Sequence, residues 1–458
     1  MRFRFFITLL ALFAVSNLLA QNVKVEVDSI FFEGNKRTKE GFLRELILLE
    51  ECVEYSQTVF DSLLTESEHR LNRSSLFKTV HANVDGVKSS GKTIVKICFV
   101  VDERWYTWPF PIFRLTDPNF NLWWRDKDFD RISYGGALRL ENINGKGDEL
   151  FVKIVSGFSQ EFRLSYSKFV RKTWGLSYGM SYIQYPTLEV DNINGERIFK
   201  KRTPHAIKER FGVGVSTARQ IDAHQSIGFS IDMYQSVALD SLLEYNSHYF
   251  GEENKSRLLT TYLSGGYHSD SRDNISFPHK GQFFSFSSRI PILGLKKVLW
   301  MNSIDFRRYK EIKRHLFSVQ FQGQWVLNAE KNTAFEFITS NRLTKVPRIF
   351  DLYVPNTLNW LQSRSQYFFL VFKNKTIKTN FIPVRQFKHP FVTLAVGPFV
   401  DQAFLHSYTD NGNLYNSWLV STGVSVQLAS YYDKVVRFDA GYNSLGDFGV
   451  FLHFTKAL

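Results

Sequence analysis

From about residue 132 to the C-terminus, apolar and polar residues alternate with a period of two. In residues 174–182, Trp, Leu, Tyr and Met alternate with Gly and Ser, and residues 227–233, 420–428 and 436–442 repeat the pattern. Successive side chains of a β-strand point to opposite faces, so the alternation predicts strands with one apolar and one small or polar face. A soluble sandwich also alternates. The repetition in segment after segment, bordered by aromatic residues, is typical of a transmembrane β-barrel with a polar lumen.

We recognise sixteen alternating segments, and an even number is what a single-chain bacterial barrel requires. Those near residues 160, 333 and 365 are the least regular, so fourteen strands remain the alternative. The predicted fold is membrane all-β, a closed antiparallel transmembrane barrel of about sixteen strands over residues 132–458. The segments begin near residues 132, 148, 160, 174, 209, 225, 256, 281, 298, 315, 333, 365, 391, 416, 434 and 447.

In residues 22–104 the spacing of apolar residues differs from that of the barrel region. It predicts one small α+β domain in the order β-α-α-β-β. Helical spacing of apolar residues runs from Thr38 to about Leu49 and again over residues 60–71, between an alternating strand before Gly34 and two strands at 77–84 and 93–101. Residues 105–131 are expected to be a linker and barrel rim, because their prolines cannot donate a hydrogen bond within a central strand.

The first twenty residues predict a secretory signal peptide. Arg2 and Arg4 precede an apolar run over residues 5–19, and Ala20 offers a small residue for cleavage before Gln21. The mature chain is therefore expected to leave the cytoplasm, and the predicted barrel is expected to lie in the bacterial outer membrane with residues 22–104 in the periplasm.

Composition narrows the function class. Aromatic residues make 16% of the chain, which excludes a disordered polymer. With 57 Lys and Arg against 44 Asp and Glu, the net charge is +13. These cations are scattered rather than collected on one helix, so we expect them on lumen, loops and periplasmic surface, with no nucleic acid as a partner.

Motifs for catalysis and cofactors are weak. Residues 86–93 match the phosphate-loop pattern G-x-x-x-x-G-K-T, but the apolar segment 94–101 that follows predicts a strand where that chemistry needs a helix, so we interpret the match as a hairpin turn. No H-E-x-x-H or C-x-x-C motif occurs. We expect no enzyme activity, no cofactor and no metal site. Cys52 and Cys98 leave open a disulfide in the N-terminal domain or two free thiols.

Two groups of residues carry a resemblance to a known family. Residues 30–38, Ile-Phe-Phe-Glu-Gly-Asn-x-x-Thr, with Gly34, Asn35 and the later Phe77, resemble a POTRA domain. The barrel region resembles the BamA/TamA outer-membrane assembly superfamily of the bacterial surface antigen type. The residues that carry this second resemblance are Asp270, Arg272, Phe277, Pro278 and Gly281 in a D-x-R…F-P-x-x-G hairpin, Phe399 and Asp401 in an F-x-D strand, and Asp447, Gly449, Leu452 and Phe454 in a C-terminal β-signal.

The resemblance implies a lumen latch. In that family the sixth loop carries an Arg-Gly-aromatic tip that folds into the lumen, and the hairpin of residues 270–281 lies beside it. The corresponding loop here, about residues 342–364, contains Arg348 and Arg364 but no Arg-Gly pair. Asp401 is the expected partner of Arg348. For Arg272, Asp270 and Asp273 are not assumed as partners because they are close in sequence, and a solvated turn residue stays the alternative to a buried, paired arginine.

The implied function is assembly, insertion or translocation of proteins at the outer membrane, without nucleotide hydrolysis. Clients would bind by β-augmentation, and a seam between the first strand, about residues 132–142, and the last, 448–454, would open. Expected partners are the lipid bilayer, unfolded or exported protein clients, and accessory periplasmic or lipoprotein subunits. With one POTRA domain, the chain is expected to be a paralogue of the central insertase. Two alternatives stay open: a passive channel or surface structural barrel whose POTRA domain docks a partner, and a dedicated two-partner secretion pore.

Overall fold

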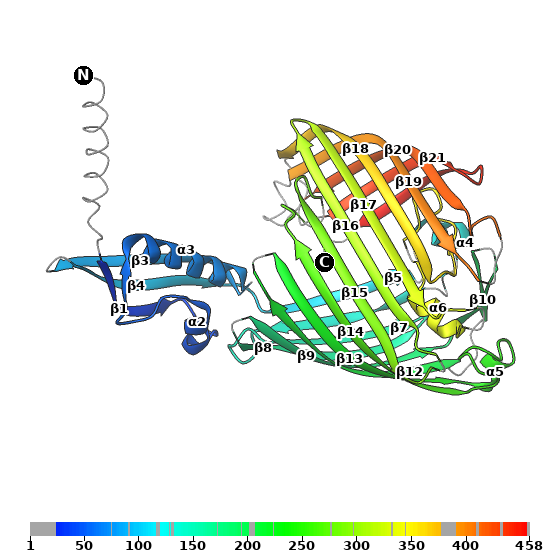
Figure 1. Cartoon of the computed structure of the whole chain (residues 1–458), viewed down its shortest axis with the longest axis horizontal. Coiled ribbons are helices and arrows are strands. Elements are labelled where there is room, and N and C mark those ends of the chain that lie inside the picture. The colour runs from blue at the N-terminus through cyan, green and yellow to red at the C-terminus, as the bar shows by residue number, and fades with distance from the viewer. Residues whose placement is uncertain are drawn as a thin grey trace, which may run out of the picture. The chain divides into compact units, whose positions relative to one another are not determined.

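The computed structural model forms two compact units, one N-terminal and one a large β-barrel (Figure 1). The first unit comprises the chain up to Trp108 with the segments Arg139–Leu150 and Ser167–Lys172, and the second comprises the remainder to Leu458. The predicted signal peptide lies outside the described residues. The structure describes residues 24–455 except 75, 90–91, 116–119, 128, 130–131, 172, 194, 201–206, 223, 275–276, 296, 331–332, 344, 377–390, 409–411 and 431–433.

The N-terminal domain is a four-stranded sheet with two helices. Strands pair in the order β2-β1-β4-β3, with β1 and β4 parallel and the other two pairs antiparallel. Apolar residues of the sheet and the helices form one core, to which Phe42, Leu43, Phe60 and Leu71 contribute from the helical side. The elements are β1 (Lys24–Glu33), α2 (Glu40–Leu46), β2 (Glu54–Ser56), α3 (Gln57–Arg73), β3 (Phe77–Ser89) and β4 (Lys92–Glu103).

The predicted α+β domain is present, with two local differences. The short strand β2 was not predicted, and α2 begins at Glu40 rather than after Thr38. Thr38 does not cap the helix, because its hydroxyl donates to the Glu103 carboxylate at 2.6 Å. Strand β4 begins at Lys92, directly after the glycine-rich segment, so the phosphate-loop pattern lacks the helix that nucleotide binding needs.

The second unit is a sixteen-stranded antiparallel sheet that forms the barrel, with short helices and one extra hairpin in its loops. No helix in the described part of the chain is long and apolar enough to cross a membrane. The strands are β5 (Thr107–Leu115), β6 (Ile132–Glu141), β7 (Glu149–Gly157), β8 (Gln160–Arg171), β9 (Trp174–Tyr185), β12 (Lys208–Gln220), β13 (Gln225–Ala238), β14 (Arg257–Asp270), β15 (Gly281–Leu293), β16 (Trp300–Ile312), β17 (His315–Leu327), β18 (Asn359–Thr376), β19 (Phe391–His406), β20 (Trp418–Ser430), β21 (Lys434–Asn443) and β22 (Phe448–Thr455). The loop elements are α4 (Phe120–Asp126), β10 (Leu188–Ile193), β11 (Glu196–Lys200), α5 (Asp240–Leu243) and α6 (Phe335–Asn341).

The strand count is confirmed, but two positions were wrong. The sheet begins at β5, inside the segment predicted as a linker, so the first strand is not the one at residue 132. Pro109 and Pro111 are tolerated there because β5 is the end strand of the sheet and needs a ladder partner on one side only. The segment predicted as a strand near residue 333 contains helix α6 instead.

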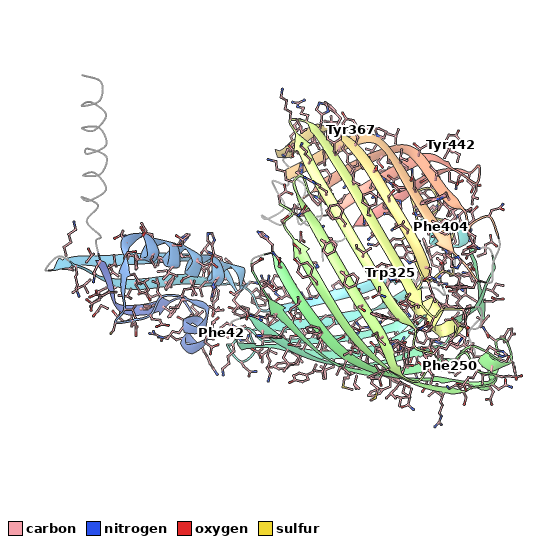
Figure 2. The ribbon with its side chains drawn as sticks, in the orientation of Figure 1. Phe42, Phe250, Trp325, Tyr367, Phe404 and Tyr442 are labelled. Carbon is pink, nitrogen blue, oxygen red and sulfur yellow. The ribbon has the colours of Figure 1, made fainter. Side chains whose placement is uncertain are left out.

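The barrel wall has an apolar outer face and a polar inner face. On β13, Phe229 is 53% exposed, whereas the neighbouring Ser230 hydroxyl donates to Asp232 at 2.8 Å. On β20, Val424 is 49% exposed and Ser425 is fully buried. Aromatic side chains such as Trp325 and Tyr442 stand on the outer face of their strands (Figure 2). The exposed apolar rows are the surface that a lipid bilayer would cover.

The two faces should respond differently to a buried charge. Phe229→Arg is expected to lower the free energy of unfolding by about 2–4 kcal/mol, the cost of a cation on the lipid face near the bilayer midplane. The matched change Ser230→Arg should cost less, because Asp232 offers a carboxylate on the lumen side. Urea titrations in lipid vesicles, read by migration of unboiled samples on gels, measure both. Equal costs would contradict this assignment of faces.

Candidate functional site

A loop between β17 and β18, residues 328–358, carries its tip into the barrel. The tip is Arg348-Ile349-Phe350, whose residues are 5%, 2% and 1% exposed. Arg364, which was predicted to belong to this loop, lies instead on the wall strand β18, directly opposite Asp401 of β19. The buried tip and the wall strands around it form what we call the lumen cluster.

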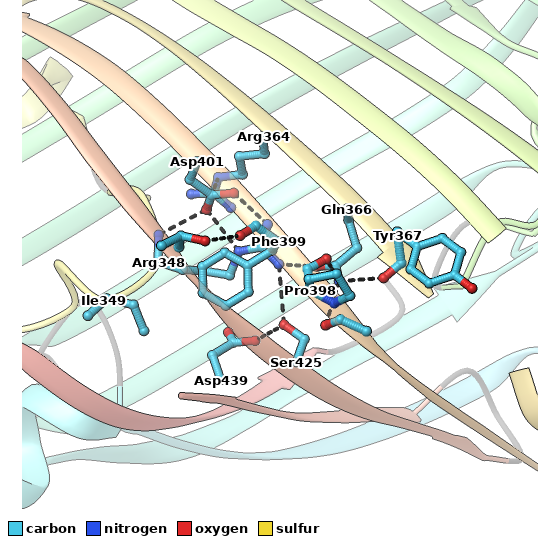
Figure 3. A network of polar contacts seen from close by, with 12 residues as sticks. Arg348, Ile349, Arg364, Gln366, Tyr367, Pro398, Phe399, Asp401, Ser425 and Asp439 are labelled. Atoms are coloured by element: carbon cyan, nitrogen blue, oxygen red, sulfur yellow. Dashed lines mark hydrogen bonds and ion pairs between the residues drawn. The ribbon is translucent and has the colours of Figure 1, made fainter. Parts of the chain in front are cut away.

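Arg348 and Asp401 are the centre of the lumen cluster. The Arg348 Nε donates to Asp401 Oδ2 at 2.8 Å and its Nη2 to Oδ1, while its backbone N–H donates to Oδ2 at 3.0 Å. Asp401 is completely buried. The two residues predicted as partners from the sequence therefore meet in a bidentate, charge-assisted geometry, the strongest form of this interaction. Figure 3 shows the contacts converging on Asp401.

The other faces of the Arg348 guanidinium are also occupied. Its Nη1 donates to the Gln366 side-chain oxygen and, at 3.3 Å, to the Ser425 hydroxyl. The guanidinium carbon lies 3.9 Å from the centre of the Phe399 ring, so the cation also stacks on an aromatic face. The F-x-D segment thus supplies two contacts from one strand, because Phe399 and Asp401 are two residues apart and share a face.

A second group of charges continues the lumen cluster to the last strands. Asp439 of β21 accepts from Arg437 at 2.8 Å and from Ser425, and lies 3.3 Å from His453 of β22. His453 is also 3.5 Å from Asp351 of the loop. The loop therefore contacts wall strands from β18 to β22. Ser425 bridges Arg348 and Asp439, so a substitution at this lumen-facing position would break both contacts.

Ile349 has a backbone conformation that is rare for its residue type. Its φ is +68°, in the left-handed region, where β-branched residues are outliers. The Ile349 side chain packs against Phe399 and Phe451, and its carbonyl accepts from the Asn443 side chain at 3.1 Å. The tip thus keeps a glycine-like backbone with isoleucine in the position after the arginine. The missing Arg-Gly pair does not prevent the arginine from reaching Asp401.

Two further buried ion pairs anchor the same loop, and sequence reasoning missed both. Lys208 of β12 lies 3.1 Å from Glu336 of α6, which also accepts from Ser236 at 2.8 Å. Arg342 donates two bonds of 2.6 Å each to the carboxylate of Glu189 on the β10–β11 hairpin. Single charged residues in loops have no periodicity, so no signal in one sequence identifies these pairs.

The hairpin of residues 270–281 is organised locally. Arg272 donates to Asp270 at 2.8 Å and 2.7 Å and stacks 4.7 Å above the Phe283 ring. Asp270 was not assumed as the partner from the sequence, but it is the partner here, because residues two apart can point to the same side. Gly281 has a φ of +95°, and a Cβ there would lie 2.2 Å from the Ser271 carbonyl oxygen. Phe277, next to Pro278, is buried among apolar residues of β17, β18, β19 and β21.

The remaining predicted residues lie at the two ends of the chain. Asp447 accepts from Tyr353 of the loop at 2.9 Å, and Gly449, Leu452 and Phe454 pair with β21. In the N-terminal domain Phe77 is in the core, and Asn35 donates to the Thr38 carbonyl at 3.1 Å. Gly34 has a φ of +89° and approaches Val101 so closely that a Cβ would lie 2.0 Å from its carbonyl oxygen.

Cys52 and Cys98 are free thiols, and burial raises the pKa of the Cys98 thiol. Among the residues that the structure describes, no group of three or more His, Cys, Asp or Glu is placed to hold a metal ion. The absence of a cofactor and of enzyme activity stays a prediction.

The fold and the lumen cluster define a class: an outer-membrane β-barrel of sixteen strands with an internally anchored loop, preceded by a small α+β domain. Residues 142–351 match the Omp85 superfamily domain. The family recognised from the sequence is thereby confirmed. That the chain has a single POTRA domain stays a prediction.

Solved structures with the same fold cover nearly the whole chain. BamA from Haemophilus ducreyi lacking POTRA domains 1–3 matches with a TM-score of 0.62 and 16% identity, over 94% of this chain and 84% of that one. CdiB from Acinetobacter baumannii matches with a TM-score of 0.54 and 10% identity, over 95% and 73%. CdiB from Escherichia coli matches with a TM-score of 0.57 and 12% identity, over 94% and 75%. No curated protein sequence matches the chain.

The Arg348–Asp401 pair should be strongly coupled. Removing either partner leaves a buried charge uncompensated, so Arg348→Ala and Asp401→Ala should each cost about 3–5 kcal/mol of stability. The double variant should cost less than their sum, with a coupling energy above about 1 kcal/mol in a double-mutant cycle. Urea unfolding of all four proteins in vesicles measures it. Additive effects would show that the pair does not hold the loop.

Because Ile349 has a left-handed backbone conformation, we expect glycine to be more stable than alanine at this position, the reverse of the usual order. Glycine in a strand or helix is usually less stable than alanine by about 0.5–1 kcal/mol. At Ile349 both changes remove the same buried side chain, but only glycine removes the left-handed strain, which is about 1–2 kcal/mol. Ile349→Gly should therefore be more stable than Ile349→Ala. The same unfolding assay ranks them, and alanine above glycine would contradict the positive φ.

Proposed function

We propose that this protein assembles, inserts or translocates other proteins at the outer membrane, without nucleotide hydrolysis. The observation that carries the proposal is that the barrel sheet ends in a short strand. In the sheet order β5 and β22 are the two end strands, and β22 has 8 residues where β18 and β19 have 18 and 16. A short end strand offers few ladder bonds. A seam at this place can open and expose backbone groups to a client strand at little cost.

The lumen cluster favours this function over a passive channel. A steady pore needs an open lumen, whereas here the tip of the loop is buried against strands β18 to β22 by ion pairs and by the packing of Ile349. Residues that fill the barrel in this way hinder the diffusion of solutes through the lumen. Binding and inserting a client strand at the seam does not require an open lumen.

The N-terminal sheet offers a first docking place for clients. Its strand β3 is an end strand of 13 residues. The Ala82 N–H points away from the neighbouring β4 and donates to Glu68 of α3 at 2.6 Å. By strand alternation the Val84 N–H faces the same way. An extended client segment can add to this edge and satisfy its own backbone groups before insertion.

The proposal includes location and partners. Residues 24–103 lie in the periplasm and the barrel in the outer membrane, whose lipids cover the exposed apolar rows. The partners are unfolded or exported polypeptides and accessory periplasmic or lipoprotein subunits. The names of the matched structures, BamA and CdiB, support a place among proteins of this superfamily without choosing between insertion and translocation.

The full-length protein in lipid vesicles should accelerate the folding of a urea-unfolded eight-stranded outer-membrane barrel protein at least severalfold over empty vesicles. Val84→Pro removes one outward backbone N–H of β3 and should reduce that acceleration, because a docked client loses a ladder bond. Val84→Ala keeps the N–H and is the matched control.

Conductance in planar bilayers separates the alternatives. Small, flickering currents agree with the proposal. A large, steady conductance together with no acceleration of client folding would overturn it in favour of a passive channel. Acceleration that is identical in Val84→Pro and Val84→Ala would overturn the role of β3 while leaving the barrel's role intact.

A further inference from the structure

The side chain of Asn121 bonds to the edge of β22. Asn121, in helix α4 of the loop between β5 and β6, accepts a hydrogen bond from the Leu452 N–H at 2.9 Å through its side-chain oxygen. Its side-chain nitrogen donates to the Leu452 carbonyl at 3.2 Å. Both backbone groups of one residue of β22 therefore bond to the same carboxamide, which comes from a segment 331 residues away in the chain.

The geometry reproduces one step of a β-ladder. Leu452 lies opposite Phe438 of β21. In an antiparallel pair, alternate residues direct both backbone groups away from the partner strand, and the bonds to Asn121 show that Leu452 is such a residue. A carboxamide has one acceptor and one donor group in a plane, like the backbone of a strand residue. Asn121 thus takes the place that a neighbouring strand would take.

We propose that Asn121 is a resident substitute for a strand residue, which blocks the edge of β22 until an extended polypeptide displaces it. The proposal rests on the function proposed above and adds a regulated step to it. The group that displaces Asn121 is the backbone of a client polypeptide. No particular client sequence is needed, because the hydrogen bonds exchanged are those of the Leu452 N–H and C=O.

Competition between the two occupants favours the client once it is aligned. Asn121 satisfies one residue of the edge, whereas an extended segment can bond Val450, Leu452 and Phe454 together, since alternate residues face the same way. The substitute is therefore strong enough to cover an otherwise unsatisfied edge and weak enough to be replaced. Backbone N–H and C=O groups without hydrogen-bond partners in a membrane cost free energy. This cost is the physical reason for Asn121 to take the place of a neighbouring strand.

Photocrosslinking at the seam tests the proposal. A photoreactive amino acid replaces Val450, whose side chain is 63% exposed, in the full-length protein in vesicles. The probe is the same urea-unfolded eight-stranded barrel protein. Asn121→Ala should increase the crosslinked yield at least threefold, because the edge is free from the start. Asn121→Asp should lie between, since a carboxylate can accept from the Leu452 N–H but cannot donate to its carbonyl.

A matched control is available on another strand. The Asn359 side chain accepts from the Val326 N–H at 2.6 Å, also a bond between a carboxamide and a strand backbone, but away from β22. Asn359→Ala should leave the yield unchanged, and heat-modifiable migration on gels checks that each variant is folded.

The outcomes separate this proposal from the one before it. If the wild-type protein accelerates client folding but Asn121→Ala crosslinks no more than wild type, the blocking role of Asn121 is overturned and the proposed function stands. If no variant crosslinks and none accelerates folding, both are overturned. An equal increase in Asn359→Ala would show general loosening and would also overturn the role of Asn121.

Discussion

A guanidinium buried inside a protein needs a carboxylate, and this requirement positions the most important loop of the barrel. Arg348 is only 5% exposed and Asp401 is fully buried, so neither is tolerable without the other. Their pairing brings the loop tip against β19, and the second acceptors Gln366 and Ser425 fix its rotation. The strain at Ile349 is a consequence: the chain must turn sharply after the arginine so that Phe350 and Asp351 also reach their buried places.

The fold was largely predictable because a barrel repeats one simple rule. Alternating faces gave the class and the number of strands, whereas the two errors have separate physical causes. β5 contains Pro109 and Pro111, which argue against a strand in the middle of a sheet but not at its end. Helix α6 contains Phe335 and Phe337 two residues apart, a spacing that imitates a strand over a short window. The two errors cancel in the count.

The candidate site was predictable only where a motif linked distant residues. The F-x-D strand and the arginine of the loop were paired from the resemblance, and they are in contact. The Arg272 pairing was not assumed, because closeness in sequence was taken to separate the two side chains, whereas residues two apart can point to the same side. The anchors Glu189 and Glu336 were invisible, since a loop charge reveals its partner only when the fold brings both together. The positive φ of Ile349 could not be predicted from the sequence either, because isoleucine is rarely found in that conformation.

The loop and the seam are parts of one connected structure. Asp351 directly follows the tip and lies 3.5 Å from His453, the residue after Leu452 on β22. Successive residues of a strand face opposite sides, so β22 offers His453 to the lumen cluster while the Leu452 backbone faces Asn121. A client that replaces Asn121 and shifts β22 therefore also moves a residue that contacts the loop. The His453–Asp351 contact thus gives β22 a direct physical link to the buried loop.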